Sequence, residues 1–177
     1  MIPLALPEVY KLIEPGPVVL LATRARTGRA NVMTMSWHMM TEFAPPSVAC
    51  VVSSANHSFK ALRSTGECVI AIPSVAMAET VVAVGNCSGR SGDKLAMLGL
   101  ATAEASLVRA PLLPQCLANL ECRVTDMTLV ERMNLFVLEV VAAWIDPRQR
   151  RAKTIHHCGY GAFIVDGRRI SLPSAKA

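Results

Sequence analysis

Short runs of apolar residues separated by polar, glycine-containing stretches dominate the first third of the chain. The run at residues 18–22 is rich in branched residues and leads into the polar stretch at residues 24–29. Such a pattern is typical of a buried strand followed by a hairpin loop. Residues 31–37 predict the returning strand, and residues 48–52 predict a third strand beyond an irregular connection that ends at Pro45-Pro46.

The middle of the chain predicts short helices between buried strands. Asn56 is placed to cap a helix whose apolar positions include Phe59 and Leu62, and Gly66 is placed to end it. A buried strand is predicted over residues 68–72, and Ser74 is placed to cap a second helix. That second helix carries Met77, Val81 and Val82. Residues 85–92 then form a loop rich in Gly, Ser and Asn, and Asp93 is placed to cap the segment 94–98.

The last third of the chain returns to strand patterns. Strands are predicted over residues 117–124, 135–145, 162–165 and 169–172, with Asp166-Gly167 as the turn between the last two. Many strands with a few short helices predict a mainly β fold, a closed barrel with helical decorations. With no internal repeat or interdomain linker in the sequence, we expect residues 1–177 to form a single domain.

The amino-acid composition predicts a partner subunit and a preference for anionic ligands. Of the 177 residues, 52% are hydrophobic and 18% are charged, more apolar than a monomer needs for its interior, so we expect a partner subunit to cover some of the excess. The net charge of +5 favours anionic ligands modestly. The basic run formed by Arg148, Arg150, Arg151 and Lys153 has no interleaved aromatic residues, so it predicts a solvated turn and no contact with nucleic acid.

The cysteines, the N-terminus and the apolar runs indicate the cellular compartment of the protein. None of the six cysteines lies at the two-residue spacing of zinc or redox motifs, and most are expected to be small core residues. The N-terminus lacks the pattern of a secretion signal, which predicts a cytoplasmic protein with reduced thiols. Pro73, Ser74 and Glu79 interrupt the longest apolar stretch, so no membrane span is expected.

Several familiar catalytic sites have no sequence signature here. The chain has neither a Walker loop nor a three-glycine dinucleotide motif, which argues against a Rossmann dehydrogenase. It also has no nucleophile elbow for a hydrolase. His156 and His157 lie beside Cys158, but adjacent histidines on a strand point to opposite faces, so no metal site is predicted.

Three polar clusters remain as candidate chemistry: Asn31 with Met35-Ser36-Trp37, residues 53–58, and residues 88–94. The hydroxyls of Ser53, Ser54 and Ser58 flank a strand-to-helix junction, where they and free backbone N–H groups are suited to hold a phosphate that Lys94 would neutralise. Serines at such a place are also ordinary helix caps. Trp37 is equally compatible with an aromatic core or interface residue and with a cofactor contact.

Taken in order, these segments resemble the flavin reductase-like family, which includes flavoredoxins and the reductase partners of two-component monooxygenases. The resemblance spans nearly the whole chain. It is carried by Gly16-Pro17-Val18, Gly28-Arg29-Ala30-Asn31 running to Ser36-Trp37, Ala44-Pro45-Pro46, the turn and helix at residues 53–63, Ser88-Gly89 and Asp93-Lys94. It implies an FMN-binding split β-barrel with a few short peripheral helices, usually a homodimer with the flavin near the subunit interface.

The resemblance also implies roles for individual residues. Asn31 corresponds to a contact with the ribityl chain or ring edge, and the backbone of Met35, Ser36 and Trp37 to the border of the isoalloxazine. Val32 and Met33, which lie between them, are also predicted to bind the cofactor. Ser53, Ser54 and Ser58 would face the phosphate, and Lys94 would approach the flavin. Where relatives often carry a histidine, this chain has Met133, which leaves His157 or Tyr160 as alternatives to close the pocket.

The function expected from the resemblance is NAD(P)H-dependent reduction of FMN. A hydride passes directly from nicotinamide C4 to flavin N5 once the rings are stacked, so no acid or base residue is required. A monooxygenase or an electron-transfer protein is the expected partner. The second hypothesis is a flavoredoxin-like carrier whose bound FMN is reduced by another protein, and the third is a flavin-free barrel that binds a different anion.

Overall fold

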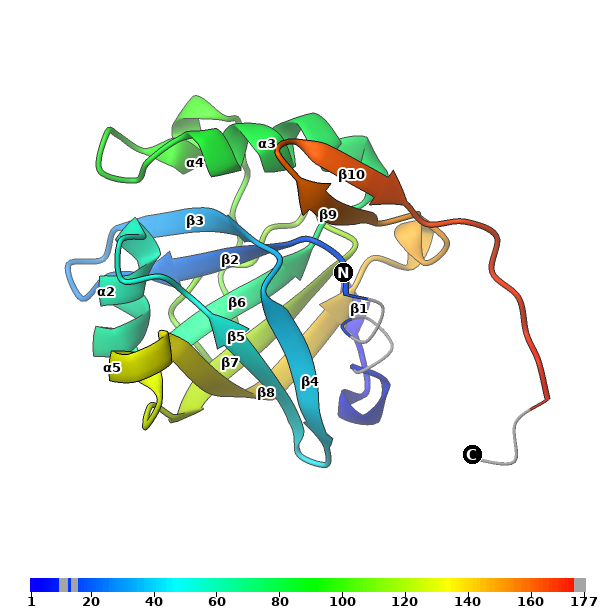
Figure 1. Ribbon diagram of the computed structural model, residues 1–177, viewed down its shortest axis with the longest axis horizontal. Helices are drawn as coiled ribbons and strands as arrows, with labels where there is room; N and C mark the ends of the chain where they lie inside the picture. Colours follow the sequence, from blue (N-terminus) through cyan, green and yellow to red (C-terminus); the bar gives the residue numbers. More distant parts are fainter. Residues whose placement is uncertain (10–12, 14–15, 174–177) are drawn as a thin grey trace.

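The computed structural model describes residues 1–9, 13 and 16–173, and this part of the chain is mainly β (Figure 1). The strands are β1 (Ile2–Pro3), β2 (Val19–Arg24), β3 (Ala30–Met35), β4 (His38–Phe43), β5 (Pro46–Val51), β6 (Glu67–Ile72), β7 (Ala118–Asp126), β8 (Leu135–Ile145), β9 (Ile155–Gly159) and β10 (Ala162–Val165). The α-helices are α2 (His57–Thr65), α3 (Ala78–Asn86), α4 (Lys94–Met97) and α5 (Val130–Met133), with 3-10 turns η1 (Leu6–Glu8), η2 (Val75–Met77) and η3 (Pro147–Gln149).

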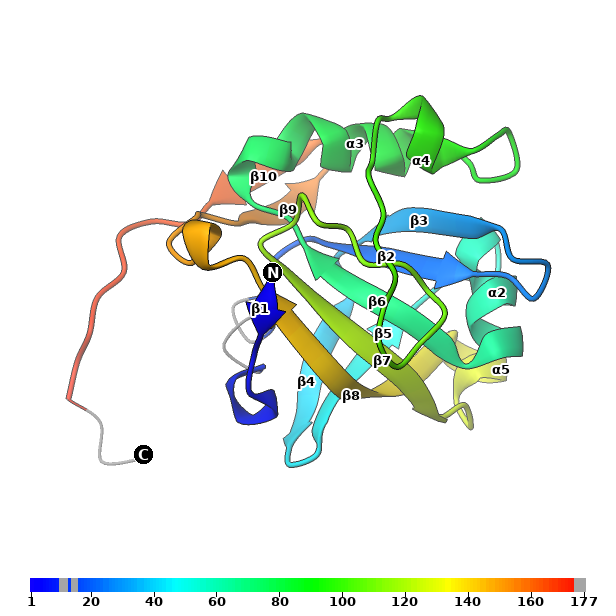
Figure 2. The ribbon, with the colours of Figure 1, turned by 180° about the vertical axis from the view of Figure 1, so that it is seen from behind.

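The main sheet is antiparallel and curls into a split barrel. Its strand order is β3-β2-β6-β7-β8-β5-β4, and β1 adds to β8. β3 and β4 follow each other in the chain but stand at opposite ends of this order, so the sheet curls until its two ends approach each other (Figures 1 and 2). β9 and β10 form a separate hairpin. The predicted split β-barrel with a few short peripheral helices is confirmed.

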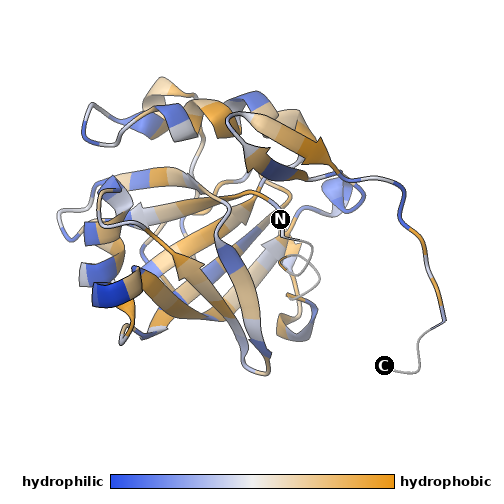
Figure 3. Cartoon of the chain, viewed as in Figure 1, coloured by the Kyte–Doolittle hydropathy of each residue, from blue (hydrophilic) through white to orange (hydrophobic). Residues whose placement is uncertain are grey.

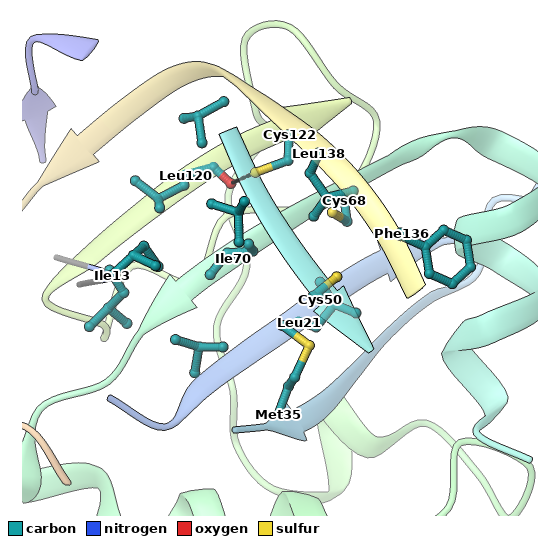
Figure 4. Close-up of a cluster of buried hydrophobic side chains, with 14 of the residues drawn as sticks. Ile13, Leu21, Met35, Cys50, Cys68, Ile70, Leu120, Cys122, Phe136 and Leu138 are labelled. Carbon is teal, nitrogen blue, oxygen red and sulfur yellow. Dashed lines mark hydrogen bonds between the residues drawn. The ribbon is translucent and has the colours of Figure 1, made fainter. Parts of the chain in front are cut away.

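Alternate residues of the barrel strands fill its interior, because successive side chains of a strand point to opposite faces. The central cluster includes Ile70 of β6, Leu120 of β7 and Leu138 of β8, all fully buried (Figure 4). Phe136 packs edge-on against Phe59 of α2. In Figure 3 the hydrophobic colour accordingly gathers on the barrel strands. This packed interior leaves the ends and the outside of the barrel for ligands.

Four cysteines are buried, as expected: Cys50, Cys68, Cys116 and Cys122. All six are free thiols. Burial, with a smaller contribution from Cys122, raises the pKa of Cys50 to about 12, so this thiol stays protonated. The buried cysteines therefore behave as small hydrophobic side chains.

A second apolar layer lies outside the barrel and positions α3 and α4. Leu20 of β2 and Val32 of β3 face outward against Val81 and Val84 of α3 and Leu95 of α4. Both helices therefore cover β3 (Figures 1 and 2). The loop that joins them is held above the beginning of β3, close to the first turn of α2.

The prediction of a strand over residues 31–37 is wrong at its C-terminal end. The structure also contains a strand, β4, that the sequence pattern did not predict. β3 ends at Met35, and β4 occupies most of the segment expected to be irregular. The pairing of β4 with β5 shifts register between Met40 and Glu42, and most of β4 is exposed. It therefore lacks the apolar alternation by which a half-buried strand is recognised.

The expected C-terminal hairpin around Asp166-Gly167 is also wrong. The observed hairpin pairs β9 with β10 through a turn at Tyr160-Gly161, and residues 166–173 form no strand. The Asp166 carboxylate instead accepts hydrogen bonds from the backbone and hydroxyl of Thr154 and contacts His156 over 2.7 Å. A long-range contact, which local turn preference does not reveal, thus fixes this aspartate.

The predicted helix caps have mixed outcomes. Gly66 ends α2 in the left-handed conformation, with φ of 67°, and Asp93 accepts from the backbone N–H groups of Leu95 and Ala96, as predicted. Asn56 precedes α2 but makes no side-chain capping hydrogen bond. Ser74 likewise makes none, and it precedes the short turn η2, after which α3 begins at Ala78.

None of the helices that the structure describes has both the length and the apolar character needed to cross a membrane.

Candidate functional site

A cavity of about 260 Å³ lies where β3, α2, α3 and α4 meet, and we call it the β3–α2 cavity. Its lining comprises Asn31, Met33 and Thr34 of β3, residues 55–58 at the start of α2, residues 84–89 at the end of α3 and beyond, and Lys94. These segments lie side by side in Figures 1 and 2. The fold therefore brings together parts of all three polar clusters singled out in the sequence.

Asn31 and Ser58 form the inner wall of the cavity. The side-chain Nδ2 of Asn31 donates to Ser58 Oγ over 2.8 Å, and both residues are buried, with exposures of 7% and 1%. Buried polar groups need such partners because leaving one unpaired is costly. The bond fixes the first turn of α2 against β3 and leaves the Asn31 carbonyl oxygen to face the neighbouring loop.

Lys94 is a buried cation beside the same wall. Its side chain is held by donation from Nζ to the carbonyl of Val32 over 2.9 Å, and the residue is only 5% exposed. Desolvation lowers the pKa of Lys94, an effect that nearby Cys87 partly opposes. A buried lysine with no carboxylate partner in the described chain is suited to meet the negative charge of a ligand.

The first turn of α2 offers backbone N–H groups to the cavity. The first four N–H groups of an α-helix have no partner within the helix, and the Asn56 side chain does not cap them. Ala55, Asn56, His57 and Ser58 all line the cavity. The N–H groups of Ala55 and Asn56 already donate to Ser53, so it is those of His57 and Ser58, with the positive end of the helix dipole, that favour an anion there.

Cationic side chains surround the same helix end. The pKa of His57 is lowered, first by desolvation and then by the positive charges of Arg29, Arg90, Lys94 and Lys60. Arg90 donates to the carbonyl of Ala55 over 2.9 Å, and Arg29 donates to the carbonyl of Gly92. Both guanidinium groups thus donate hydrogen bonds to neutral carbonyls. A phosphate is a stronger acceptor and would replace these carbonyls.

Gly89 brings the loop after α3 into close contact with the inner wall. A Cβ atom built on this residue would lie 2.3 Å from Asn31 Oδ1 and 2.6 Å from His57 Cδ2. Such distances are far inside van der Waals contact, so a larger residue would displace the loop. Gly89 therefore lets residues 88–92 close one side of the cavity, consistent with the close backbone approach that glycine permits.

Four of the predicted cofactor residues line the cavity: Asn31, Met33, Ser58 and Lys94. Val32 contributes its carbonyl to Lys94 while its side chain packs outside the barrel. Met35 is buried in the barrel core, and Ser36 lies half-buried in the link to β4.

Trp37, Ser53 and Ser54 lie near the cavity elements but do not line the cavity. Trp37 is 70% exposed, and its carbonyl accepts from Val51 N. Ser53 Oγ accepts from Ala55 N over 3.3 Å, which makes it a local turn contact. Ser54 N donates to the side chain of Asn134. All three are exposed.

Sequence reasoning missed Thr34, His57 and Arg90 as parts of this site. Thr34 Oγ1 donates to the carbonyl of Val81, which ties β3 to α3 beside the cavity. His57 and Arg90 lie within polar clusters that the sequence did single out. No local signal, however, indicates that Arg29 and Arg90 approach the same helix end from two different loops.

The remaining candidates lie elsewhere in the fold. His156 contacts Asp166, and the ring of His157 packs at a tilt against that of Phe163 with the centroids 5.4 Å apart, both in or beside the β9–β10 hairpin. Tyr160 is fully exposed at the tip of this hairpin, and Met133 is 53% exposed at the end of α5. In the part of the chain that the structure describes, no group of three or more His, Cys, Asp or Glu side chains is arranged to hold a metal.

Comparison with known proteins gives matches over most of the chain. Residues 13–162 match the family model of the flavin reductase like domain. The protein YddH of Escherichia coli, described as uncharacterized, is 33% identical over 183 aligned positions that cover 96% of this chain and 97% of YddH.

Solved structures match the fold closely. The FMN-binding domain of a flavin reductases-like enzyme from Shewanella baltica superposes with a TM-score of 0.91 at 26% identity, covering 97% of each chain. Flavoredoxin of Desulfovibrio vulgaris gives a TM-score of 0.81 at 22% identity, covering 91% of this chain and 92% of its own, a likeness of fold alone.

Proposed function

The chain belongs to the flavin reductase-like family, and from this premise we propose that it binds FMN at the β3–α2 cavity and passes to it a hydride from NADH or NADPH. The observation that carries the proposal is the concentration of positive charge at one end of this cavity. Arg29, Arg90 and Lys94 surround the uncapped first turn of α2. This is the donor set that a phosphate requires.

The residues present fit FMN. Gly89 provides the close backbone approach, and a side chain there would fill the space beside Asn31 and His57. Ser58 and the N–H groups of the α2 turn would face the phosphate, with Ser53 and Ser54 reaching it from the exposed side. Asn31 would contact the ribityl chain or the ring edge.

The ring system would lie along β3 toward its C-terminal end. Val32, Met33 and Met35 belong to this strand, and Ser36 and Trp37 follow it. Lys94 would hold its charge near the flavin while remaining anchored to the Val32 carbonyl. The indole of Trp37 is exposed on that side, so a nicotinamide or a second subunit would be able to pack against it.

FMN, when bound, supplies the redox chemistry, since its N5 accepts the hydride that leaves nicotinamide C4. The protein's contribution is binding and orientation: the cations hold the phosphate, and the Asn31–Ser58 wall fixes the sugar chain. A hydride transfer between stacked rings needs no acid or base in its path. We accordingly assign no catalytic acid or base to this chain.

An anaerobic visible spectrum tests the proposal. Purified protein is supplemented with FMN, desalted, and then treated with NADH and afterwards NADPH. Flavin that is retained and bleaches faster than free FMN supports the reductase. A rate of nicotinamide oxidation no higher than that of free FMN contradicts it.

The same spectrum distinguishes the reductase from the second hypothesis, a flavoredoxin-like electron carrier. The fold is compatible with both, because flavoredoxin has a similar fold. A carrier retains its flavin but stays oxidised with either nicotinamide. Its reduction then needs a protein donor. A monooxygenase component would be the corresponding partner of the reductase, because such an enzyme consumes reduced flavin.

We further propose a homodimer. Trp37, Met39 and Phe43 are 70%, 62% and 57% exposed in and beside β4, the end strand of the main sheet. Large apolar side chains on such an edge are expected to be covered by a partner. Light scattering of the purified protein measures its mass directly, and a monomer at micromolar concentration would contradict this proposal.

A further inference from the structure

A second cavity lies at the other end of the barrel, and we call it the basic groove. Its volume is about 1290 Å³. Apolar residues from four segments line it: Pro3, Leu4 and Ala5 are exposed or partly exposed, whereas Ile72, Leu117 and Ile145 are buried. They lie at or after the end of β1, at the ends of β6 and β8, and immediately before β7. The groove therefore has a hydrophobic part on which the apolar body of a ligand can lie.

Five cations line the same groove: Arg150, Arg151, Lys153, Arg168 and Arg169. All five are exposed. Their side chains make no hydrogen bond or ion pair with another residue of the described chain. Arg148 nearby differs, because it is paired with Asp146 over 3.1 Å. The five cations come from two separate segments of the chain, so their convergence is a property of the fold.

The carboxylates of the groove are fewer and engaged. Asp166 accepts two hydrogen bonds from Thr154, each of 2.8 Å, and contacts His156. Glu8 is the second carboxylate of the lining and also has an interaction of its own. Among the lining residues that the structure describes, five cations against two engaged carboxylates leave an excess positive charge beside an apolar surface.

The basic groove is separate from the β3–α2 cavity. Asn31 of the cavity pairs with Thr23, near the end of β2. Ala71 pairs with Leu20, near the beginning of β2, and Ile72 of the groove follows it. At about 3.3 Å per residue, the strand places the two sites roughly 10 Å or more apart along the barrel. No residue of the described chain lines both cavities.

We propose that the basic groove binds an amphipathic organic anion, a small molecule with an apolar body and a carboxylate, sulfonate or phosphate head. The body would lie on Pro3, Leu4 and Ala5, the more accessible apolar residues of the lining. The head would be held by the arginines of residues 150–151 and 168–169, whose guanidinium groups match the geometry of such oxyanions. This ligand is distinct from the flavin, and its binding does not depend on the function proposed above.

Two fluorescent probes test the charge requirement. Anilinonaphthalene sulfonate has an aromatic body and an anionic head, whereas N-phenylnaphthylamine has a similar body without the charge. The wild type is expected to bind the sulfonate more tightly than the neutral probe. The double variant Arg150→Gln/Arg168→Gln is expected to weaken sulfonate binding by about fivefold or more while changing neutral-probe binding little.

The control removes the same number of charges elsewhere. Arg26→Gln/Arg132→Gln lowers the net charge equally, outside both cavities, and should leave sulfonate affinity unchanged. Calorimetric titration of FMN-saturated protein should give the same sulfonate affinity as flavin-free protein. Equal loss in both double variants, or full displacement of the sulfonate by FMN, would overturn the proposal. So would conversion of a dimer to a monomer by the groove variant, because the groove would then be a subunit interface.

Discussion

Asn31 Nδ2 donates to Ser58 Oγ over 2.8 Å, and this buried bond joins β3 to the first turn of α2 at the wall of the proposed FMN site. Ser58→Ala would leave the amide of Asn31 without its acceptor. We expect the free energy of unfolding to fall by about 1–3 kcal/mol, the usual cost of an unpaired buried donor. Urea unfolding measures this change.

Ser64→Ala is the matched control on the same helix. Ser64 is exposed, and its hydroxyl donates only to the carbonyl of Ala61 over 3.2 Å. Its loss should cost less than about 0.5 kcal/mol. Equal costs for the two variants would show that the buried bond has no special role in positioning α2.

Gly89→Ala tests the close approach of the loop to the cavity wall. The added Cβ would collide with Asn31 and His57, so the loop must move away. We expect FMN affinity to fall by about tenfold, equivalent to about 1.4 kcal/mol. Gly167→Ala is the control, because nothing lies within 4 Å of its Cβ position. Unchanged FMN affinity in Gly89→Ala would place the flavin elsewhere.

Lys94→Met is expected to weaken FMN binding without lowering the stability of the protein at neutral pH. Desolvation lowers the pKa of Lys94, so the unfolded chain binds this proton more tightly than the native protein does. The native protein therefore gains stability as the pH rises through the lowered pKa toward the ordinary lysine value of 10.5, and the variant lacks this gain. Relief of the desolvation offsets the loss of the hydrogen bond to the Val32 carbonyl, so at neutral pH we expect the variant to be about as stable as the wild type, with FMN affinity reduced by about tenfold or more.

Thermal unfolding across the alkaline range and FMN titration check both parts of this prediction. Any stability advantage of Lys94→Met should shrink as the pH rises. A variant that binds FMN normally, or that is markedly less stable at neutral pH, would contradict the role given to the buried ammonium.

His57 should couple FMN binding to pH. Surrounding cations contribute to the lowered pKa of His57, and a bound phosphate would offset their charge and raise that pKa. Binding then takes up a proton, so affinity rises as the pH falls from about 8 to about 6. We expect this rise to be about threefold larger in the wild type than in His57→Gln, where only the phosphate itself titrates.

Riboflavin is the control ligand for this titration because it lacks the phosphate. Its affinity should show no difference in pH dependence between the wild type and His57→Gln. Fluorescence quenching of each flavin gives the dissociation constants. Identical FMN profiles for the two proteins would mean that His57 does not sense the phosphate.

Much of the fold could be predicted from local patterns because they reflect burial and backbone geometry. Residues 18–22 and 68–72 are apolar in sequence, and they form strands buried on both faces, between the barrel core and the outer layer. Gly66 ends its helix because, lacking a Cβ, it readily adopts the left-handed conformation, and Asp93 begins its helix because its carboxylate caps the first turn. β4 escaped prediction because it is largely exposed, and the C-terminal turn was misplaced because Thr154 and His156 engage Asp166.

Residues of the candidate site could be predicted from the sequence only where they belong to a recognisable motif. Asn31, Ser58 and Lys94 stand in segments that resemble a known family, and the fold gathers them around one cavity. Arg29 and Arg90 are 61 positions apart in loops, and both lie near His57. Their convergence depends on how α3 packs over β3, which no local pattern encodes.

The most direct test of the central claim is to compare FMN with riboflavin in calorimetric titrations of the wild type and of Arg29→Gln/Arg90→Gln. The two flavins differ only in the phosphate, which we place beside these arginines. The wild type is expected to bind FMN at least about tenfold more tightly than riboflavin, and the double variant to lose most of that preference while binding riboflavin as before. An unchanged preference for FMN in the double variant would contradict the account.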